Sequence, residues 1–343
     1  MAQGPAKRLY KDGFGSNDKP SLNHQKNAMH IFTAEATAAA LPFERLVPAL
    51  RAAFCGPITV PQRHIHPIGQ PAQGTTLIMP AWDLQAGFMG IKIVNVFAGN
   101  AQRGLPGLHA NYLLYDAHTG VPLALMDGDV ITARRTAAAA ALGAAFLARE
   151  DAAHLLVLGA GRVASMLPAA FAAVRPIARV SVWNHRPEGA QRLAAQWREQ
   201  GWDAQAVTEL AQAVPAADII SCATLSQQAL VEPQWLAPGA HLDLIGSFTP
   251  AMQEAAPGCL AQARVFVDTD EALQKAGDLL RAIEAGAWQR EALQGDLFQL
   301  CRGSRTGRAN ASERTVFKAV GNALEDLAAA QLVWAARPAS ASA

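Results

Sequence analysis

The sequence predicts an α/β protein in which a Rossmann-type, doubly wound parallel sheet follows a smaller, mainly antiparallel α+β domain. In the second half of the chain, short apolar runs alternate with helical stretches, as in parallel sheets covered by helices. Residues 58–126 instead hold closely spaced strand-like runs separated by turn residues, without room for long crossovers. A glycine-rich segment, GAGRVA, directly follows the first apolar run of the second half.

The composition favours a globular protein with a small-molecule partner. The chain has 343 residues, of which 51% are hydrophobic and 17% charged, enough for two domains with sizeable cores. Its 29 Lys and Arg nearly balance 28 Asp and Glu, so we expect neither a nucleic-acid nor a membrane partner. Four scattered cysteines predict no disulfide framework and no metal site, and they favour a cytoplasmic location.

Breaks in the pattern divide the chain into five segments. The start is polar and lacks periodicity, and globular patterning begins near Met29. We predict a flexible leader at 1–28, a first domain at 29–135, a Rossmann domain at 136–312, a C-terminal helix at 313–336 that returns to the first domain, and a tail at 337–343.

The first domain is predicted to open with a helix over 33–54 that is interrupted at Pro42. Five strands should follow, the last two joined by a tight turn at Gly120. A long alanine-rich helix then begins at Asp127 or Asp129, and we expect it to be buried in the protein. The predicted strands are 58–68, 75–80, 87–97, 109–116 and 121–126.

The second domain is predicted to alternate six short strands with helices before a final helix at about 313–335. The six strands are 154–158, 179–184, 203–207, 217–223, 240–245 and 263–268.

The GAGRVA segment is predicted to hold the pyrophosphate of a dinucleotide. Gly159 permits a tight turn after the strand, Gly161 lets the backbone approach the phosphates, and Ala164 lets helix and strand pack closely. The N-terminus of the following helix favours negative charge. The remaining residues of this loop are Ala160, Arg162 and Val163.

The end of the second strand predicts which dinucleotide binds. NAD sites usually place Asp or Glu there, where the carboxylate accepts hydrogen bonds from the ribose. This chain has Asn184, followed by His185 and Arg186. The missing carboxylate removes repulsion toward a 2′-phosphate, and an arginine can bind that phosphate through two hydrogen bonds. We therefore expect NADPH, with NADH possible.

Three cations of the first domain are candidate site residues. Lys92 lies in a strand that is apolar on both faces, so its ammonium should be buried, which is costly without an anion. Arg63 stands beside His64, and Arg135 lies in the first turns of the long helix. Either internal carboxylates neutralise these cations, or a substrate carboxylate does. The first domain itself has few Asp and Glu, and the residues alone leave both alternatives open.

Nine segments carry a resemblance: PQR (61–63), MP (79–80), GIKIVNVFAGNAQRGLP (90–106), TGVPLALMDGDVITARRTAA (119–138), LGAGRVA (158–164), VSVWNHR (180–186), ADIISCAT (217–224), IGSFTPAMQE (245–254) and RTVFKAVGNALEDLA (314–328). In this order they are similar to the ornithine cyclodeaminase/mu-crystallin family, from about residue 29 to residue 334. The resemblance implies a homodimer formed through the first domains and an active site between the two domains. It also implies that Arg63, Lys92 and Arg135 bind a substrate carboxylate.

The resemblance further favours one activity within the family. Its cyclodeaminases carry a catalytic Asp just after the glycine of the IGSFTPAMQE loop, whereas this chain has Ser247 after Gly246. A hydroxyl is a poor base at neutral pH. The pattern looks most like reductases of cyclic ketimines, which convert Δ1-pyrroline-2-carboxylate to L-proline and Δ1-piperideine-2-carboxylate to L-pipecolate. We expect that reaction with NADPH, and no metal.

Other roles and activities stay open at this point. The proton donor could be Lys92 or one of the histidines at 64, 66 and 109, and Ser247 could lie beside the substrate. Thr224, Gly246 and Lys318 complete the predicted cofactor contacts. Alternative functions are ornithine cyclodeamination, an alanine dehydrogenase-type reaction, and non-catalytic NADPH binding in the manner of the crystallin.

Overall fold

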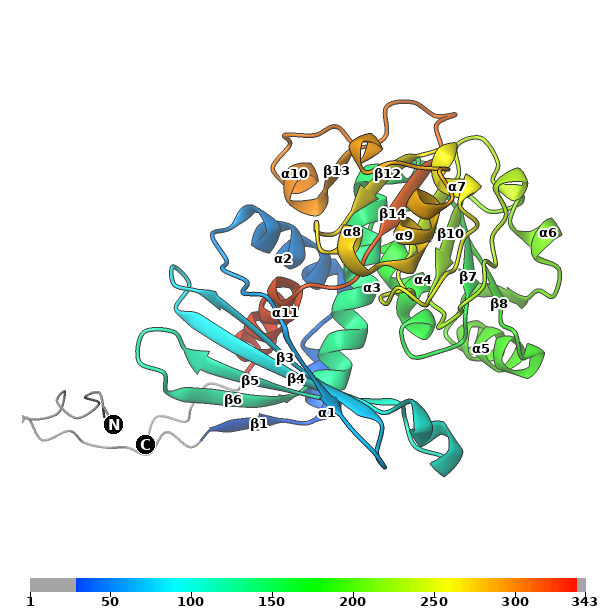
Figure 1. Cartoon of the computed structure of the whole chain (residues 1–343). Helices are drawn as coiled ribbons and strands as arrows, with labels where there is room; N and C mark the ends of the chain where they lie inside the picture. Colours follow the sequence, from blue (N-terminus) through cyan, green and yellow to red (C-terminus); the bar gives the residue numbers. More distant parts are fainter. Residues whose placement is uncertain (1–28, 338–343) are drawn as a thin grey trace, which may run out of the picture.

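The computed structural model describes residues 29–337 as two sheets with helices packed between and around them (Figure 1). The predicted leader at 1–28 and the tail from residue 338 onward lie outside the described residues. The first domain holds a six-stranded sheet, and the second holds an eight-stranded parallel sheet. Both predicted sheet types are confirmed.

The first sheet has the strand order β1-β6-β5-β4-β3-β2 and is antiparallel except for the pairing of β1 with β6. The predicted strand 58–68 is only partly right, because the strand begins at His64 and Thr59 forms just an isolated bridge with Trp82. The hairpin is confirmed, with Gly120 at a φ of 72°. The strands are β1 (His30–Phe32), β2 (His64–Ile68), β3 (Gly74–Asp83), β4 (Phe88–Val96), β5 (Leu108–Asp116) and β6 (Pro122–Asp127).

Helices α1 (Ala34–Ala39) and α2 (Phe43–Cys55) are separated at Pro42, as predicted. The long helix α3 (Gly128–Leu147) begins at Asp127, whose side chain accepts a hydrogen bond from the N–H of Val130. By length and composition α3 could cross a membrane, but 67% of its most apolar window is buried inside the protein, as is typical of a core helix. A short 3-10 helix, η1, spans Ala98–Arg103.

The second sheet contains all six predicted strands and two more, every neighbouring pair parallel. Its order is β13-β12-β14-β11-β10-β7-β8-β9. The strands are β7 (His154–Leu158), β8 (Arg179–Trp183), β9 (Asp203–Ala206), β10 (Ile219–Cys222), β11 (His241–Leu244), β12 (Arg264–Val267), β13 (Gly295–Asp296) and β14 (Thr315–Lys318).

Short helices connect these strands. The α-helices are α4 (Leu167–Ala172), α5 (Pro187–Glu199), α6 (Leu210–Ala213), α7 (Gly258–Ala261), α8 (Ala272–Lys275), α9 (Gly277–Glu284) and α10 (Leu297–Cys301). The 3-10 helices are η2 (Ala164–Met166), η3 (Pro233–Trp235) and η4 (Arg290–Ala292).

The predicted helix at 313–335 is wrong over its first ten residues, 313–322. Residues 315–318 form β14, which lies between β11 and β12, and helix α11 begins only at Ala323 and ends at Ala335. All four residues of β14 are buried, and a short apolar run buried on both faces has no alternation that would mark it as a strand.

Helix α11 packs against α2, α3, β3 and β4, and so returns the chain from the second domain to the first (Figure 1). Helix α3 also contacts both sheets, through β5 in the first and through β14 and β11 in the second. At one of these contacts Gly143 lies against the ring of Phe317, where a Cβ would come within 2.7 Å of the ring. The predicted domain boundary at 135/136 therefore falls inside one continuous helix that joins the two domains.

Candidate active site

The loop after β7 has the shape that a dinucleotide pyrophosphate requires. Gly159 has a φ of 109°, and a Cβ there would lie 2.6 Å from the carbonyl oxygen of Ala223. A Cβ on Gly161 would meet nothing within 4 Å, so the backbone borders open space. Among the described residues, the N–H groups of residues 160–163 have no hydrogen-bond acceptor. These donors fit an anion.

The end of β8 carries the residues predicted to distinguish NADPH from NADH. Asn184 donates a hydrogen bond from Nδ2 to the carbonyl oxygen of Arg186 at 3.0 Å, and Gly189 lies directly against the Asn184 amide. The side chains of His185 and Arg186 are exposed at the start of α5. The strand end therefore offers an amide and two basic side chains where a carboxylate would bind the NAD ribose.

Thr224 and Gly246, at the ends of β10 and β11, are held together by Glu254, a residue to which the sequence assigned no role. One Glu254 carboxylate oxygen accepts hydrogen bonds from the N–H and hydroxyl of Thr224, at 2.7 and 2.8 Å. The other accepts from the N–H groups of Gly246 and Ser247, at 2.9 and 3.1 Å. Burial raises the pKa of Glu254 to about 7. Glu254 thus fixes two loops that line the cavity described below.

Two predicted site residues, Ser247 and Lys318, make other contacts in the structure. The hydroxyl of Ser247 is buried and donates to the carbonyl oxygen of Met252 at 3.1 Å. Lys318 is fully buried, with its Nζ 3.3 Å from a carboxylate oxygen of Asp278. Neither residue lines either of the two cavities described below. Lys318 instead provides positive charge beneath the Glu254 loop, where its charge favours ionised Glu254.

Lys92, Arg63 and Arg135 line one cavity of about 240 Å³, together with Thr224 and Gly246. This volume is smaller than that of most drug-sized sites, so the cavity suits a small metabolite. Its walls come from the inner face of the first sheet, from α3, and from the ends of β10, β11 and β14. Its other lining residues are Leu77, Met79, Val94, Val96, Leu108, Thr132, Thr136, Ala139, Val163, Ala223, Leu225, Ile245, Phe248, Ala319, Val320, Gly321 and Glu325.

The two buried cations are paired with carboxylates of α11. The Nζ of Lys92 lies 2.8 and 2.7 Å from the two carboxylate oxygens of Asp326. Arg135 donates to Glu325 at 2.7 Å, and its Nε lies 2.9 Å from Asp326. The first domain has few carboxylates, but the inference that its cations therefore lack an internal anion is wrong. The anions come from α11, which packs against the first domain although Glu325 is 190 residues after Arg135 and Asp326 is 234 residues after Lys92.

Arg63 sits at the edge of the cavity. It donates to Glu271 and to the carbonyl oxygen of Gly321, both at 2.7 Å. Arg63 and Met79 also border a second, more open cavity of about 620 Å³ that lies beside the first. Because the two cavities share these residues, Arg63 stands between the buried cations and the open cavity.

The charged groups shift one another's pKa values. Burial and the neighbouring Arg135 lower the pKa of Lys92 to about 8. Burial opposes ionisation of Asp326, but Lys92 and Arg135 outweigh it, and the pKa of Asp326 lies below its ordinary value. Burial raises the pKa of Glu325 to about 7, against the attraction of Arg135. Asp326, behind the cavity wall, is therefore the more firmly ionised carboxylate, and Glu325, which lines the cavity, has a pKa near neutral pH.

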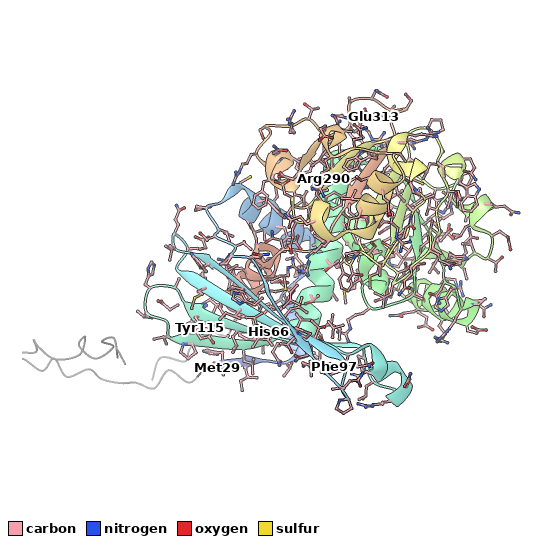
Figure 2. All side chains as sticks on the ribbon, in the orientation of Figure 1. Met29, His66, Phe97, Tyr115, Arg290 and Glu313 are labelled. Atoms are coloured by element: carbon pink, nitrogen blue, oxygen red, sulfur yellow. The ribbon has the colours of Figure 1, made fainter. Side chains whose placement is uncertain are left out.

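His64, His66 and His109 do not reach this cavity. The register pairs His64 with Ile78, His66 with Thr76, and Asn95 with His109, which places all three histidines on the sheet face opposite Lys92. All three are exposed, and His66 is visible on the sheet in Figure 2. The structure thus gives His64 no contact with the cavity.

Glu254, Glu325 and Asp326 were not predicted as site residues, although the sequence around each of them offered a signal. Glu325 and Asp326 are adjacent acids in ALEDLAAA, a segment that is otherwise apolar on every side. Glu254 likewise ends a loop with no other charge. Acids in such surroundings are buried with partners or functional, and the partners were not identifiable without the fold. Among the described residues, no group of three His, Cys, Asp or Glu could hold a metal ion.

A parallel sheet with a glycine-rich cradle at its carboxyl edge, opening onto a cavity with buried cations, defines a nicotinamide-dependent oxidoreductase. The sequence matches the model of the ornithine cyclodeaminase/mu-crystallin family over residues 33–339. The chain belongs to that family, as its motifs predict, and is an NAD(P)H-dependent enzyme.

Similar proteins agree with this assignment. The Δ1-pyrroline-2-carboxylate reductase of Paracoccus denitrificans is 41% identical over 278 residues, covering 80% of this chain and 88% of that protein. The Thermococcus litoralis Δ1-pyrroline-2-carboxylate reductase, solved with NADH and L-proline, is 28% identical with a TM-score of 0.86, covering 90% of this chain and 97% of that one. An archaeal alanine dehydrogenase dimer with bound NAD is 27% identical with a TM-score of 0.83, covering 90% and 95%.

Proposed function

We propose that this protein reduces cyclic ketimine carboxylates with NADPH, converting Δ1-pyrroline-2-carboxylate to L-proline and Δ1-piperideine-2-carboxylate to L-pipecolate. The observation that carries the proposal is the meeting of Lys92, Arg63 and Arg135 with Thr224 and Gly246 around one small cavity. The named reductases among the similar proteins support the same reaction class.

The bound nicotinamide would supply the hydride, and the chain supplies binding and orientation. Lys92 and Arg135 present buried positive charge to the substrate carboxylate, and Arg63 closes on it from the edge of the cavity. Their geometry would hold the imine carbon at the nicotinamide end of the cradle, so the reaction gains from positioning. Apolar residues such as Leu77, Val94 and Ile245 exclude water around the reacting bond.

The Ser247 position disfavours cyclodeamination. That reaction needs a base beside the substrate amino groups, but the Ser247 hydroxyl is buried and donates to Met252. An alanine dehydrogenase-type reaction and cofactor binding without turnover remain as outcomes of the test below.

The β8 end favours NADPH over NADH. Asn184 places no negative charge near a 2′-phosphate, and the exposed guanidinium of Arg186 has no carboxylate partner among the described residues. A free arginine at this position can bind the phosphate through charge-assisted hydrogen bonds.

We also propose that the enzyme is a homodimer formed through the outer face of the first sheet. The register aligns Ile31, Leu125, Leu113 and Ile91 in one row across β1, β6, β5 and β4. Ile31 is 72% exposed, and helices α3 and α11 pack on the opposite face. An apolar row of this length on an outer face is typical of a protein interface. A second copy of the chain offers the same row.

The test is oxidation of NADPH by the purified protein with Δ1-pyrroline-2-carboxylate, with NADH as the cofactor control. We expect rapid oxidation of NADPH and much slower oxidation of NADH. Parallel reactions would contain ornithine with NAD, and alanine with NADP or NAD. Turnover of ornithine or alanine without turnover of the ketimine would replace the proposal by the corresponding activity. Tight NADPH binding with no turnover of any of them would favour the non-catalytic, crystallin-like function.

A further inference from the structure

Glu325 has an unusual place in the cavity. It lies in the first turn of α11, its side chain is fully buried, and it lines the cavity beside Arg135. One oxygen, Oε2, accepts the hydrogen bond from Arg135. The other, Oε1, has no hydrogen-bond partner among the described residues. A buried carboxyl oxygen without a partner is costly if the group is ionised, and less so if the group is protonated.

The surrounding charges favour a proton on Glu325 rather than on its neighbours. Asp326 contacts both Lys92 and Arg135, which stabilise its ionised form. Asp268, which follows β12, accepts hydrogen bonds from the N–H groups of Thr269, Val320 and Gly321. Burial raises the pKa of Asp268, and these three hydrogen bonds partly offset that rise by stabilising its carboxylate.

Glu325 has only the bond from Arg135 to favour its ionised form directly, although the helix N-terminus assists weakly. Asp268 and Asp326 both add negative charge nearby, and Arg63, before β2, is already paired with Glu271. The pKa of Glu325 is raised to about 7, with burial as the largest cause. A substrate carboxylate bound by the cations would add more negative charge and raise this pKa further.

We propose that Glu325 is the proton donor to the imine nitrogen of the substrate. This assignment rests on the proposed ketimine reduction. It supplies the acid that the reaction needs, a role that neither the cations nor the histidines fill. Lys92 is a poorer candidate, because its ammonium is held by both oxygens of Asp326. The three histidines lie on the far face of the sheet.

The Oε–H bond of Glu325 breaks and an N–H bond forms, which converts the neutral imine to an iminium and leaves Glu325 as a carboxylate beside Arg135. The C=N π electrons would move to nitrogen as the imine carbon accepts the hydride that a bound NADPH would supply. The substrate would thereby gain two electrons, and the nicotinamide would lose them. Glu325 then regains a proton from water. General acid catalysis of this kind contributes roughly 100- to 10,000-fold.

The test compares two substrates in the variant Glu325→Gln. The first is Δ1-pyrroline-2-carboxylate, which needs a proton on nitrogen. The second is its N-methyl iminium, which carries a permanent positive charge and needs none. The glutamine keeps an oxygen that can accept the bond from Arg135. The matched control is Glu313→Gln, because Glu313 lies at the edge of the second domain far from the first sheet (Figure 2).

We expect Glu325→Gln to lower kcat/KM for the imine by about a hundredfold or more at pH 7. The ratio of wild-type to variant kcat/KM should decline above pH 7, as wild-type Glu325 loses its proton. Turnover of the N-methyl iminium should stay within about threefold of the wild type, and NADPH affinity should be unchanged. The control variant should behave as the wild type with both substrates.

Two results would overturn the assignment while leaving the proposed function intact. The first is a variant that reduces the imine at the wild-type rate. The second is an equal loss with both substrates, which would show that Glu325 only shapes the cavity. A wild-type protein that reduces neither substrate would instead reject the ketimine reductase function, and the proton-donor role with it.

Discussion

At the scale of single residues, Lys92 is paired with Asp326 in the folded chain, and we propose that it also binds the carboxylate of the substrate. Replacing Lys92 by Met removes the cation and leaves Asp326 buried beside Arg135 alone. We expect kcat/KM for the ketimine to fall by about 100-fold or more, because a buried charge-assisted contact is worth about 1.5–3 kcal/mol before any loss of orientation. Steady-state kinetics and NADPH binding by fluorescence would separate catalysis from cofactor affinity.

Stability should also fall, by about 3–5 kcal/mol, as is usual when one member of a buried ion pair is removed. The control is Arg192→Met on the exposed side of α5, which removes a positive charge without touching the cavity. Unchanged kcat/KM in Lys92→Met would contradict a role for this cation in substrate binding.

Glu325 should leave a signature in the pH dependence of stability. Its pKa is about 7 in the folded protein and about 4.5 in the unfolded chain, so the folded state retains a proton that the unfolded state releases between these values. The contribution of this proton to the free energy of unfolding is fully present below about pH 4.5 and is lost as the pH rises through 7. The total loss is roughly 3 kcal/mol.

The wild-type free energy of unfolding should therefore fall, relative to Glu325→Gln, between pH 5 and pH 7.5. Urea unfolding at several pH values would measure this difference. Glu254 titrates in the same range in both proteins, so it cancels in the comparison. If the free energies of unfolding of the two proteins ran parallel with pH, Glu325 would not change its protonation on unfolding.

At the scale of elements, the junction of β8 and α5 should set cofactor preference. Replacing Arg186 by Ala removes the predicted phosphate contact, and adding Asn184→Asp restores a carboxylate for the ribose. We expect the single change to weaken NADPH binding roughly 10- to 100-fold and the double change to favour NADH. KM values for both cofactors would test this. An unchanged preference in the double variant would place cofactor discrimination elsewhere.

The loops after β10 and β11 depend on Glu254. In Glu254→Ala the N–H groups of Thr224, Gly246 and Ser247 lose their shared acceptor, while Lys318 and Asp278 remain beneath. We expect a loss of a few kcal/mol of stability and a weaker affinity for the nicotinamide half of the cofactor. Calorimetry and NADPH titration would measure both effects. A variant with normal cofactor affinity would show that these loops hold their shape without the carboxylate.

At the scale of the whole molecule, the outer face of the first sheet should form the dimer. Leu113→Asp places a charge in the middle of the apolar row, on the face opposite the active-site cavity. We expect the wild type to be a dimer by light scattering and the variant to be monomeric or weakly associated. Val121→Asp, at the exposed hairpin, adds the same charge outside the row and should stay dimeric. A dimeric Leu113→Asp protein would move the interface elsewhere.

The sequence predicted most elements because their signals are local. The glycines after β7, the break at Pro42 and the cap at Asp127 each depend on neighbouring residues. The strand β14 escaped prediction because it is buried on both faces and so lacks alternation. It lies in the sheet between β11 and β12, although it is the last of the eight strands of this sheet in sequence.

The fold class, the glycine-rich loop after β7, the family and the three cations that line the cavity could all be predicted from the sequence, because each depends on short motifs or periodic patterns. The groups that neutralise those cations could be identified only from the packing of the folded chain. Glu325 and Asp326 reach Arg135 and Lys92 because α11 returns to the first domain, and that return depends on packing between residues 190 and 234 positions apart in the sequence. Packing of this kind sets which charges share a low-dielectric cavity, and therefore which group holds a proton near neutral pH.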